Sequence, residues 1–425
     1  MARPKGVEDS NGLSGGAEGM VPDETVATRA PTGGAFTAVF ALVVLMLVAG
    51  IAVAVVGYFE GPVVTGIDGA QWSAQSDYVR RNLTLLPLPR LDLVNDQLTY
   101  PYETSNVFLP WVLEMHLFSA ALDRLTGGFG PWEQVYFLLS VIVACLGTYL
   151  LLQREVGRGP AALTSLAVTF ANYYALAKFP GHLGVACVHW MTLNLVADFV
   201  IVRRQVDHRP VSAPLLLLRA LLLVLALGQE LGYVCGIALT SFVVSSAFLL
   251  GLHLVRLRAR PRRVTAAVRA AARGLARSAA RNPALSGSLA LATVAAAWLY
   301  VPLVARIALA TRAFDFSQLP TGAWWANPLR LLMPILPGFN PVSHAGLLDD
   351  SAEGLFAASP GLFFVLAALV GLVMGGRRLL AAVPALALLA LFLTYHPSEM
   401  PLLELLPWFG FARVSSRFTI AYPIL

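Results

Sequence analysis

The sequence predicts an all-α integral membrane protein, a polytopic bundle of about ten transmembrane helices with a large first extracytoplasmic loop. Hydrophobic residues make up 57% of the 425 residues, charged residues make up 13%, and the mean hydropathy is +0.69. A soluble domain carries about 25% charged residues, so this chain has too few polar groups to cover a water-facing surface. The apolar residues also fall into runs of roughly twenty, the length that crosses a hydrocarbon core of about 30 Å. A soluble enzyme and a disulfide scaffold are therefore excluded.

The chain begins with a polar segment and then turns apolar. Residues 1–35 are rich in Gly, Pro, Glu, Asp and Thr and show no periodicity, which is typical of a disordered tail. The run Phe36–Phe59 is long enough to span a membrane, and no small-residue cleavage site of a signal peptide precedes it. We expect this run to remain as a signal anchor and to open a polytopic domain covering 36–425.

The following apolar runs predict further spans. In chain order they are expected at 134–153, 160–177, 183–202, 214–234, 236–255, 284–305, 358–374 and 379–395. A tenth span begins near Arg417 and is cut off at Leu425, so the chain looks like a C-terminally truncated fragment.

Basic residues predict the orientation of these spans. If the N-terminus is cytoplasmic, most Lys and Arg residues fall in cytoplasmic segments, above all in the loop 256–283. The Ala/Arg pattern of that loop predicts an amphipathic helix on an anionic membrane surface. Orientation signals also explain the net charge of +6 without nucleic-acid binding. We therefore expect a multi-pass plasma-membrane protein with a cytoplasmic tail.

This orientation places three long loops outside, at 60–133, 306–357 and 396–416. Loops of such length are uncommon unless they serve a function. Within the first, the moderately apolar stretch 106–125 carries four ionisable residues, Glu114, His116, Asp123 and Arg124, and so predicts an interfacial helix rather than a span.

Two acidic residues of the first outer loop are candidate general bases. Asp68 follows the first span closely and lies between Gly66 and Gly69, which allow a tight turn and close approach of a ligand. A carboxylate there can accept the proton of an attacking hydroxyl group. Asp96 is the alternative, because it precedes an aromatic, Pro-containing stretch. Solvated loop acids are the competing interpretation for both.

Lys178 and His182 are expected at the outer ends of two neighbouring spans, joined by a Pro180-Gly181 turn. His189 lies seven residues after His182 and would share its helical face about two turns deeper. Ionisable groups at membrane depth are costly and are therefore candidates for function. A snorkelling lysine and a hydrogen-bonded core histidine remain the alternatives.

Further candidates lie later in the chain. Glu230, near the outer end of the 214–234 run, needs a partner, either Lys178, His182 or an outer-loop arginine. Arg413 and Arg417 are four residues apart, so on a helix they would share a face and clamp a phosphate group. Asp198 is expected to pair with Arg203 or Arg204 and has no assigned role.

These residues occur in a recognisable order. An acidic outer loop follows the first span, Asn172-Tyr173-Tyr174 ends another, and Pro180-Gly181-His182 enters the next. FARVSSRF (411–418) precedes a late span, and NPLRLLMPILPGFNPVSH (327–344) fills a long outer loop. Over roughly 36–425 the chain resembles the GT-C-type polytopic membrane glycosyltransferases, in particular the YfhO-like and 6-pyruvoyl-tetrahydropterin synthase-related membrane protein families.

The resemblance implies a helical bundle that takes a sugar from a polyprenyl-phosphate donor at the outer face. An acidic residue after the first span acts as base in that superfamily, which assigns this role to Asp68. Cationic groups hold the lipid phosphate, a role that falls to Lys178, His182, Arg413 and Arg417. The acceptor would be an extracytoplasmic glycan, lipid or protein.

Two other classes of function remain open. One is a transporter or flippase of lipid-linked saccharide, and the other is a non-catalytic membrane scaffold. No Gly-rich nucleotide-binding loop is present, which agrees with a lipid-linked donor. The sequence carries no metal-ligand spacing among Cys145, Cys187 and Cys235, and we expect no metal and no cofactor.

Overall fold

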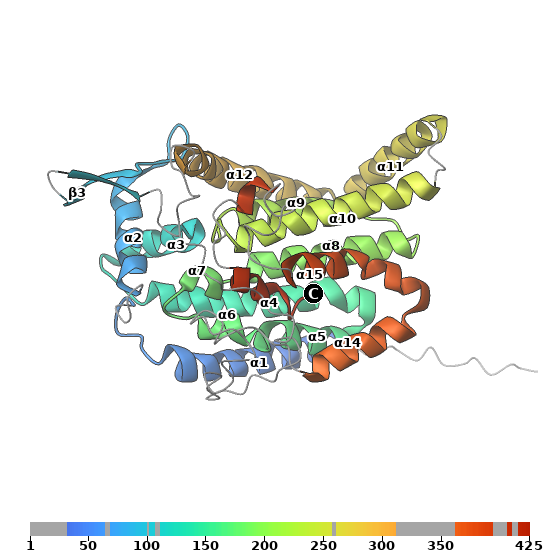
Figure 1. Ribbon diagram of the computed structural model, residues 1–425, viewed down its shortest axis with the longest axis horizontal. Coiled ribbons are helices and arrows are strands. Elements are labelled where there is room, and N and C mark those ends of the chain that lie inside the picture. Colours follow the sequence, from blue (N-terminus) through green and yellow to red (C-terminus); the bar gives the residue numbers. More distant parts are fainter. Residues whose placement is uncertain are drawn as a thin grey trace, which may run out of the picture.

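The computed structural model describes residues 32–63, 69–99, 102–106, 111–256, 261–311, 362–393, 406–409 and 415–425. Most of the expected tail and most of the second and third outer loops lie outside these described residues, as do Asp68 and Arg413. The described chain is almost entirely helical (Figure 1). This agrees with the predicted fold class.

Within the described residues, five helical segments are long and apolar enough to cross a membrane. They are Gly34–Val56, Trp132–Val156, Leu183–Val206, Val234–Arg256 and Pro283–Thr311. The first combines α1 (Thr32–Ile51) with the π-helix η1 (Ala52–Val56), and the others contain α4, α8, α10 and α12 (Figure 1). Each coincides with an apolar run that the sequence predicts as a span.

The long helices run side by side (Figure 1). Helix α4 (Trp132–Val156) contacts α1 and α8 (His189–Val206), and α8 in turn contacts α10 (Val234–Arg256). The shorter helices fill the gaps: α5 (Arg158–Phe170) lies on α4, α9 (Ala213–Ala226) lies between α8 and α12 (Pro283–Thr311), and α15 (Val383–Leu393) lies on α10. Helix α14 (Leu362–Met374) joins α15 through the 3₁₀ helix η7 (Gly376–Ala381).

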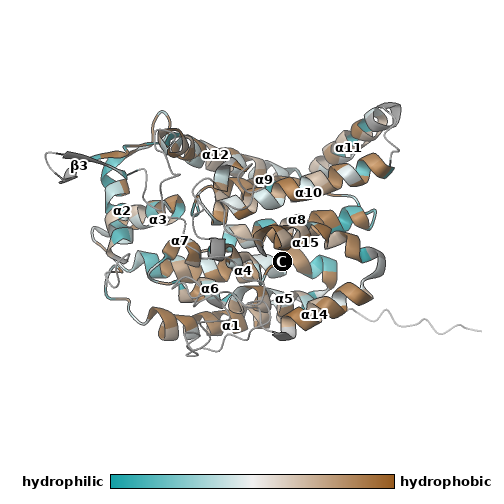
Figure 2. Cartoon of the chain, viewed as in Figure 1, coloured by the Kyte–Doolittle hydropathy of each residue, from teal (hydrophilic) through white to brown (hydrophobic). Residues whose placement is uncertain are grey.

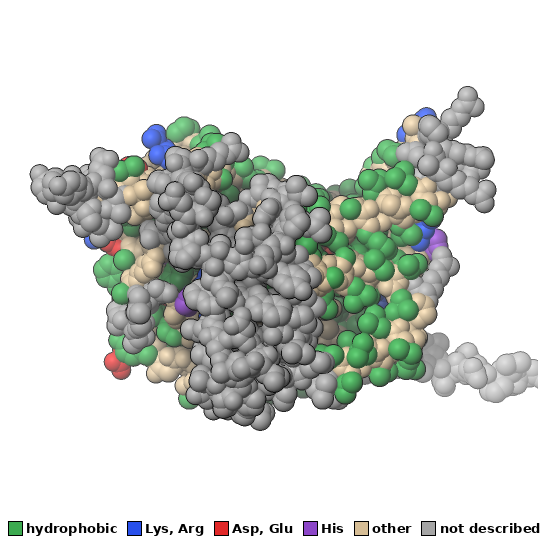
Figure 3. Space-filling model, in the orientation of Figure 1, with side chains coloured by type: hydrophobic (Ala, Val, Ile, Leu, Met, Phe, Trp, Pro, Cys, Tyr) green, Lys and Arg blue, Asp and Glu red, His purple; other side chains and the backbone are tan. Residues whose placement is uncertain are grey.

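The exposed side chains of the long helices are mainly hydrophobic, as expected for helices surrounded by lipid. Hydrophobic residues dominate the long helices in Figure 2, and hydrophilic residues gather toward their ends. On the face drawn in Figure 3, hydrophobic side chains cover much of the described flank of the bundle, and charged ones lie mainly toward the two ends. Helix α1 exposes Val39, Leu42 and Met46 by more than half. Such an exposed apolar belt is expected where lipid replaces water.

Three of the predicted spans are interrupted. The run 160–177 divides into α5 and α6 (Tyr173–Ala177), where the Asn172 side chain accepts a hydrogen bond from Ala175 N and donates one to Ile420 O. The run 183–202 divides into α7 (Leu183–Ala186) and α8. The run 214–234 ends early, because α9 stops at Ala226 and α10 begins at Val234. Hydropathy alone does not reveal such breaks, since the flanking residues remain apolar.

The described part of the first outer region contains two helices and two small antiparallel strand pairs. Helix α3 (Leu113–Thr126) is the expected interfacial helix. Helix α2 (Gly69–Asn82) was not expected, and it buries Trp72, Gln75, Ser76 and Val79 at helical spacing against its neighbours. Strand β1 (Leu83–Thr84) pairs antiparallel with β2 (Arg90–Leu91), and β3 (Val94–Thr99) pairs antiparallel with β4 (Tyr102–Ser105).

A buried ion pair joins the middle of three helices. Arg219 of α9 donates to both carboxylate oxygens of Asp198 on α8, at 2.5 and 3.0 Å. Ser241 of α10 donates to the same carboxylate at 2.6 Å, and Asn194 accepts from the guanidinium group. The prediction that Asp198 pairs with Arg203 or Arg204 is therefore wrong. Sequence proximity suggested those partners, but helix packing brings a residue from the next helix closer.

Arg204, one of the predicted partners of Asp198, forms an ion pair at one end of the bundle instead. Arg204 and Arg209 donate to the buried carboxylate of Glu155 at the end of α4, at 2.5 and 2.8 Å. Near the same end of α4, Thr37 of α1 forms a hydrogen bond with Tyr149. Helix α11 (Pro261–Arg281) also belongs here, since Ser278 accepts from the backbone of Ala213. We call this the arginine end, and the opposite end, which carries α2 and α3, the Glu114 end (Figure 1).

We expect Asp198→Ala to destabilise the folded protein by about 3–5 kcal/mol, because it leaves the Arg219 guanidinium buried without its counter-charge. Unfolding in detergent measures this change. The control is Asp207→Ala, which removes only the half-exposed pair with Arg203 at 3.9 Å and should cost about 0–1 kcal/mol. Equal stability of the two variants would contradict a structural role for the buried pair.

Candidate functional site

The break between α7 and α8 is closed by one side chain, Gln229. Its Nε2 atom donates to the carbonyl oxygen of Cys187 at 2.8 Å, and its Oε1 atom accepts from the backbone N of Met191 at 3.0 Å. Both backbone groups lack a helical partner at this break. Because water is absent from an apolar interior, such groups need an internal partner. The amide side chain supplies one donor and one acceptor, which explains why the interruption is tolerated.

Glu114 lies beside the first turn of α8. Its backbone N donates to Gly228 O at 2.8 Å, which fixes the start of α3 on the turn that follows α9. Its Oε2 atom accepts from Trp190 Nε1 at 2.6 Å and lies 3.6 Å from His189 Nε2. The carboxylate is 20% exposed, whereas His189 is 3% exposed. The site therefore has one face open to a ligand and one face held by the bundle.

The hydrogen bonds of His189 indicate which ring nitrogen carries the proton. Nδ1 lies 2.9 Å from Ser140 Oγ and 3.3 Å from Gln229 Nε2. Gln229 Nε2 can only donate, and its identity follows from its contact with the Cys187 carbonyl. Nδ1 is therefore an acceptor in neutral His189, and the N–H on Nε2 faces Glu114. An N–H beside a carboxylate can donate a hydrogen bond to it and stabilise its charged form.

Aromatic rings surround this carboxylate. Tyr136 meets the His189 ring edge-on, with 5.8 Å between centroids. Tyr300 of α12 packs on Gly228, where an added Cβ would lie 2.8 Å from Tyr300 Cζ and 3.1 Å from Glu114 Cβ. Only a glycine lets both side chains approach the backbone at this point. The result is a carboxylate with an aromatic wall formed by Tyr136, Trp190 and Tyr300.

A second polar cluster lies between α2, α3 and α4. His116 is fully buried, with Nδ1 3.2 Å from Ser76 Oγ, and Ser76 donates to Glu133 Oε1 at 3.3 Å. The rings of Trp72 and Trp111 pack on His116. Burial lowers the pKa of His116 to about 3, because the charged imidazolium would lose its hydration. His116 is therefore neutral at physiological pH and serves the packing of the outer region.

This burial predicts an acid sensitivity. The unfolded chain binds a proton at His116 below about pH 6.5, and the folded chain does so only near pH 3. Stability therefore falls as pH drops through this window, by about 1.4 kcal/mol for each pH unit below the unfolded pKa. We expect the melting temperature of His116→Gln to fall less between pH 7 and pH 5 than the melting temperature of the parent protein. An identical loss in both proteins would contradict neutral burial of this imidazole.

Lys178 and Arg417, which are predicted to bind phosphate, both lie beside one hydrophobic cluster. Lys178, 7% exposed, places Nζ 5.0 Å from the centre of the Tyr174 ring, and the Arg417 guanidinium lies 5.5 Å from that of Tyr233. Both tyrosines belong to the cluster that also contains Phe418. Arg417 belongs to the 3₁₀ helix η10 (Ser415–Ala421) rather than to an α-helix. Arg413 lies outside the described residues, so its predicted shared face with Arg417 stays a prediction.

Glu230 and His182 differ from expectation in their surroundings. The Glu230 carboxylate accepts from the backbone N of Gly232, Tyr233 and Val234 at 2.9, 2.6 and 3.1 Å. It thus satisfies the free N–H groups at the start of α10 and favours the positive helix end. His182 lies just before α7, so the break separates it from His189, and the predicted shared helical face is wrong.

The structure describes neither side chain of the two acidic residues predicted as bases. Asp68 lies outside the described residues, and Asp96 lies in strand β3, where the structure describes its backbone alone. Both assignments stay predictions. The structure adds Glu114, which the sequence indicated only as one charge of an interfacial helix. A signal was present, because Gln229 and Glu230 stand out as polar residues in an apolar run, but nothing in the sequence linked them to Glu114.

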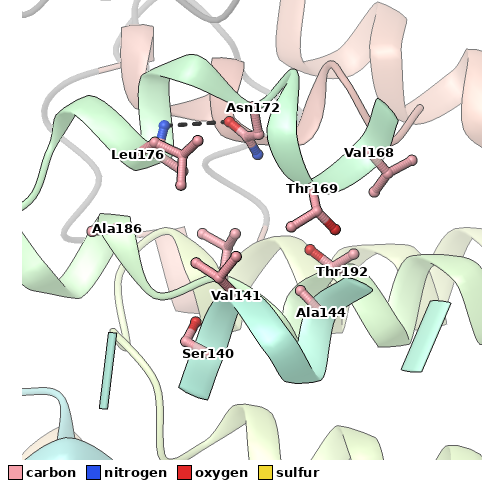
Figure 4. Close-up of a pocket in the computed structure, with 11 residues that line it drawn as sticks. Ser140, Val141, Ala144, Val168, Thr169, Asn172, Leu176, Ala186 and Thr192 are labelled. Carbon is pink, nitrogen blue, oxygen red and sulfur yellow. Dashed lines mark hydrogen bonds between the residues drawn. The ribbon is translucent and has the colours of Figure 1, made fainter. Parts of the chain in front are cut away.

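A small cavity lies between α4, α5 and α8, next to Ser140, the hydrogen-bond partner of His189. It has a volume of about 20 Å³, enough for one water molecule. Its polar lining comes from Ser140, Thr169, Asn172 and Thr192, and the hydroxyl groups of Thr169 and Thr192 point toward one another (Figure 4). Since pockets for drug-sized ligands have about 300–1,000 Å³, this cavity cannot admit a sugar. A substrate of Glu114 would have to bind at its exposed face.

No known protein family, curated protein or solved structure matches this chain.

Proposed function

We propose that this protein is a membrane glycosyltransferase that moves a sugar from a polyprenyl-phosphate donor to an extracytoplasmic glycan, lipid or protein. The observation that carries the proposal is the partly exposed Glu114 carboxylate, held by Trp190 and His189 at one end of an apolar helical bundle. The proposal includes a GT-C-like bundle of about ten spans. The described residues contribute five helices that are long and apolar enough to cross a membrane.

A carboxylate in this setting suits general base catalysis. The attacking hydroxyl of an acceptor must lose its proton as the new bond to the sugar forms. Glu114 can take that proton, and the Nε2 N–H of His189, which faces the carboxylate, can stabilise the charge that it carries before the reaction. Aromatic rings beside a carboxylate also offer an amphipathic wall for an acceptor that presents both C–H and O–H groups. Asp68 and Asp96 remain candidates for the same role.

Cations near the same end support a phosphate-bearing donor. Lys178 directly follows α6. Three residues later, the carbonyl of Gly181 accepts a hydrogen bond from Trp72 Nε1 of α2 at 3.2 Å, which places this turn at the Glu114 end. Arg417 approaches through η10, which contacts α6. A phosphate leaving group gains negative charge during transfer, and positive groups nearby lower that cost. His182 and Arg413 are proposed to assist, as neighbours of these two residues in the sequence.

The distribution of charge supports an orientation with a cytoplasmic N-terminus. The start of α1 and helix α11 belong to the arginine end, and α2 and α3 belong to the other end. Cytoplasmic segments carry an excess of Lys and Arg in membrane proteins. This assigns the arginine end to the cytoplasm and the Glu114 end to the outer face, where lipid-linked sugars are used.

A transporter of lipid-linked saccharide is the second candidate. It is favoured by the α7–α8 break and by the Arg219–Asp198 pair, since broken helices and intramembrane charges are features of transporters. The two candidates differ in product: a transferase consumes the lipid-linked sugar, and a transporter only moves it across the bilayer.

We expect Glu114→Gln to slow sugar transfer by about a hundredfold to ten-thousandfold, because the amide keeps the shape and cannot accept the proton. The measurement is transfer from a synthetic polyprenyl-phosphate sugar by purified protein, with melting recorded alongside. Asp68→Asn and Asp96→Asn are run in parallel. The control is Asp77→Asn, whose carboxylate is already paired with Arg80 and Arg81.

The results separate the candidate bases. Loss of transfer in Glu114→Gln alone, at unchanged melting, assigns the base to Glu114. Full activity in this variant, with loss in Asp68→Asn or Asp96→Asn, moves the base to the first outer loop. If the parent protein moves the donor between leaflets without forming product, the transferase proposal is wrong and the transporter is correct.

Lys178 should contribute to donor binding. Removing a charge-assisted contact to phosphate costs about 1.5–3 kcal/mol, so Lys178→Ala should weaken donor binding by this amount while Lys178→Arg retains most of it. Titration with a fluorescent polyprenyl-phosphate analogue measures both. Donor binding at the parent level in Lys178→Ala, with an intact fold, would show that this lysine only packs against Tyr174.

A further inference from the structure

Helix α11 (Pro261–Arg281) stands apart from the rest of the bundle in composition. It contains six arginines and no acidic residue: Arg262, Arg263, Arg269, Arg273, Arg277 and Arg281. No acidic residue occurs anywhere between Glu230 and Asp315 in the sequence. The positive charge of this helix therefore has no neutralising neighbour along the chain.

The described arginines of α11 form one stripe. Arg269, Arg273, Arg277 and Arg281 follow one another at intervals of four, so they lie on one side of the helix. All four are exposed. Within the described residues, Arg273 Nε of this stripe forms a weak hydrogen bond with the carbonyl of Arg269 at 3.4 Å. An array of like charges repels itself, so it needs an external anion to be favourable.

The opposite side of α11 is apolar and only partly covered. Val268 is 63% exposed, and Leu275, seven residues later on the same face, is half-buried. Near its C-terminal end the helix is held by α9, where Ser278 accepts from the N-terminal backbone of that helix at 3.1 Å. Packing within the bundle therefore accounts for one end of the helix and leaves the apolar face around Val268 largely exposed.

We propose that α11 is a docking surface for the anionic phospholipids of the bilayer that surrounds the protein. Its arginine stripe contacts lipid phosphate groups, and the face around Val268 lies against the acyl chains. A helix with a strong basic face and an opposite apolar face lies in the membrane interface. Helix α11 follows α10 and precedes α12 in the chain, and it extends from the bundle where these two long apolar helices meet it (Figure 1). Arginine forks match the geometry of phosphate groups, which favours phospholipid over a neutral surface.

The test uses a fluorophore on the apolar face. Val268→Cys is labelled with an environment-sensitive dye, since the native cysteines Cys145, Cys187 and Cys235 are all buried. The labelled full chain is reconstituted in vesicles of phosphatidylcholine alone, or of equal parts phosphatidylcholine and phosphatidylglycerol. Quenching by a lipid with a nitroxide on its acyl chain then reports contact between the dye and the membrane interior.

We expect stronger quenching in the vesicles with phosphatidylglycerol, and a decrease in this difference as salt is added. Replacing Arg269, Arg273, Arg277 and Arg281 with Gln should remove the dependence on lipid charge. Each arginine near an anionic surface contributes about fivefold in binding. The matched control replaces four arginines of the Glu114 end, Arg80, Arg81, Arg90 and Arg124, with Gln and should keep the dependence.

Three outcomes would overturn the proposal. One is equal quenching in the two kinds of vesicle, and another is unchanged quenching in the α11 variant. The third is a dye that stays in water or against protein, without quenching by the lipid nitroxide. Melting of each variant before reconstitution shows that the comparison concerns folded protein. Failure of sugar transfer would leave this result unchanged, since the measurement does not use the proposed reaction.

Discussion

The side-chain amide of Gln229 is the interaction on which the Glu114 end depends. A helix in an apolar surrounding cannot be interrupted unless the released backbone groups find partners. The interruption between α7 and α8 releases the carbonyl of Cys187 and the N–H of Met191, and Gln229 binds both. Without this amide, each buried group would remain unpaired at a cost of about 1–3 kcal/mol. The break between α7 and α8 would then lose the contacts that stabilise it.

The same turn positions the candidate acid–base group. Gly228 O accepts from the backbone of Glu114, which docks α3 onto the segment between α9 and α10, and Glu230 satisfies the start of α10. Because the break makes His189 the first residue of α8, its ring lies at the end of the helix, between Ser140 and Glu114. The segment that pairs the free backbone groups at the break therefore also sets the positions of Glu114 and His189. A polar group needed by the fold also sets the tautomer of the histidine beside the carboxylate.

The helical class and several long helices were predictable, because α1, α4, α10 and α12 arise from apolar runs without a break. Helix α11 was predictable for a similar reason, since its arginine spacing fits a helix surface. The breaks were not, because an apolar run has the same hydropathy whether its backbone is continuous or interrupted. The site was only partly predictable for a further reason. Glu114 and His189 are distant in sequence, and the partner of Asp198 came from the neighbouring helix rather than from nearby arginines.

Amide hydrogen exchange at the α7–α8 break, measured in the parent protein and in Gln229→Leu, tests this account most directly. Leucine keeps a similar volume and removes the amide, so Met191 loses its acceptor while the apolar packing is kept. The account predicts faster exchange in peptides that cover 187–193, with no change in peptides from the middle of α12. Unchanged exchange across 187–193 in a folded Gln229→Leu protein would contradict the claim that this side chain closes the break.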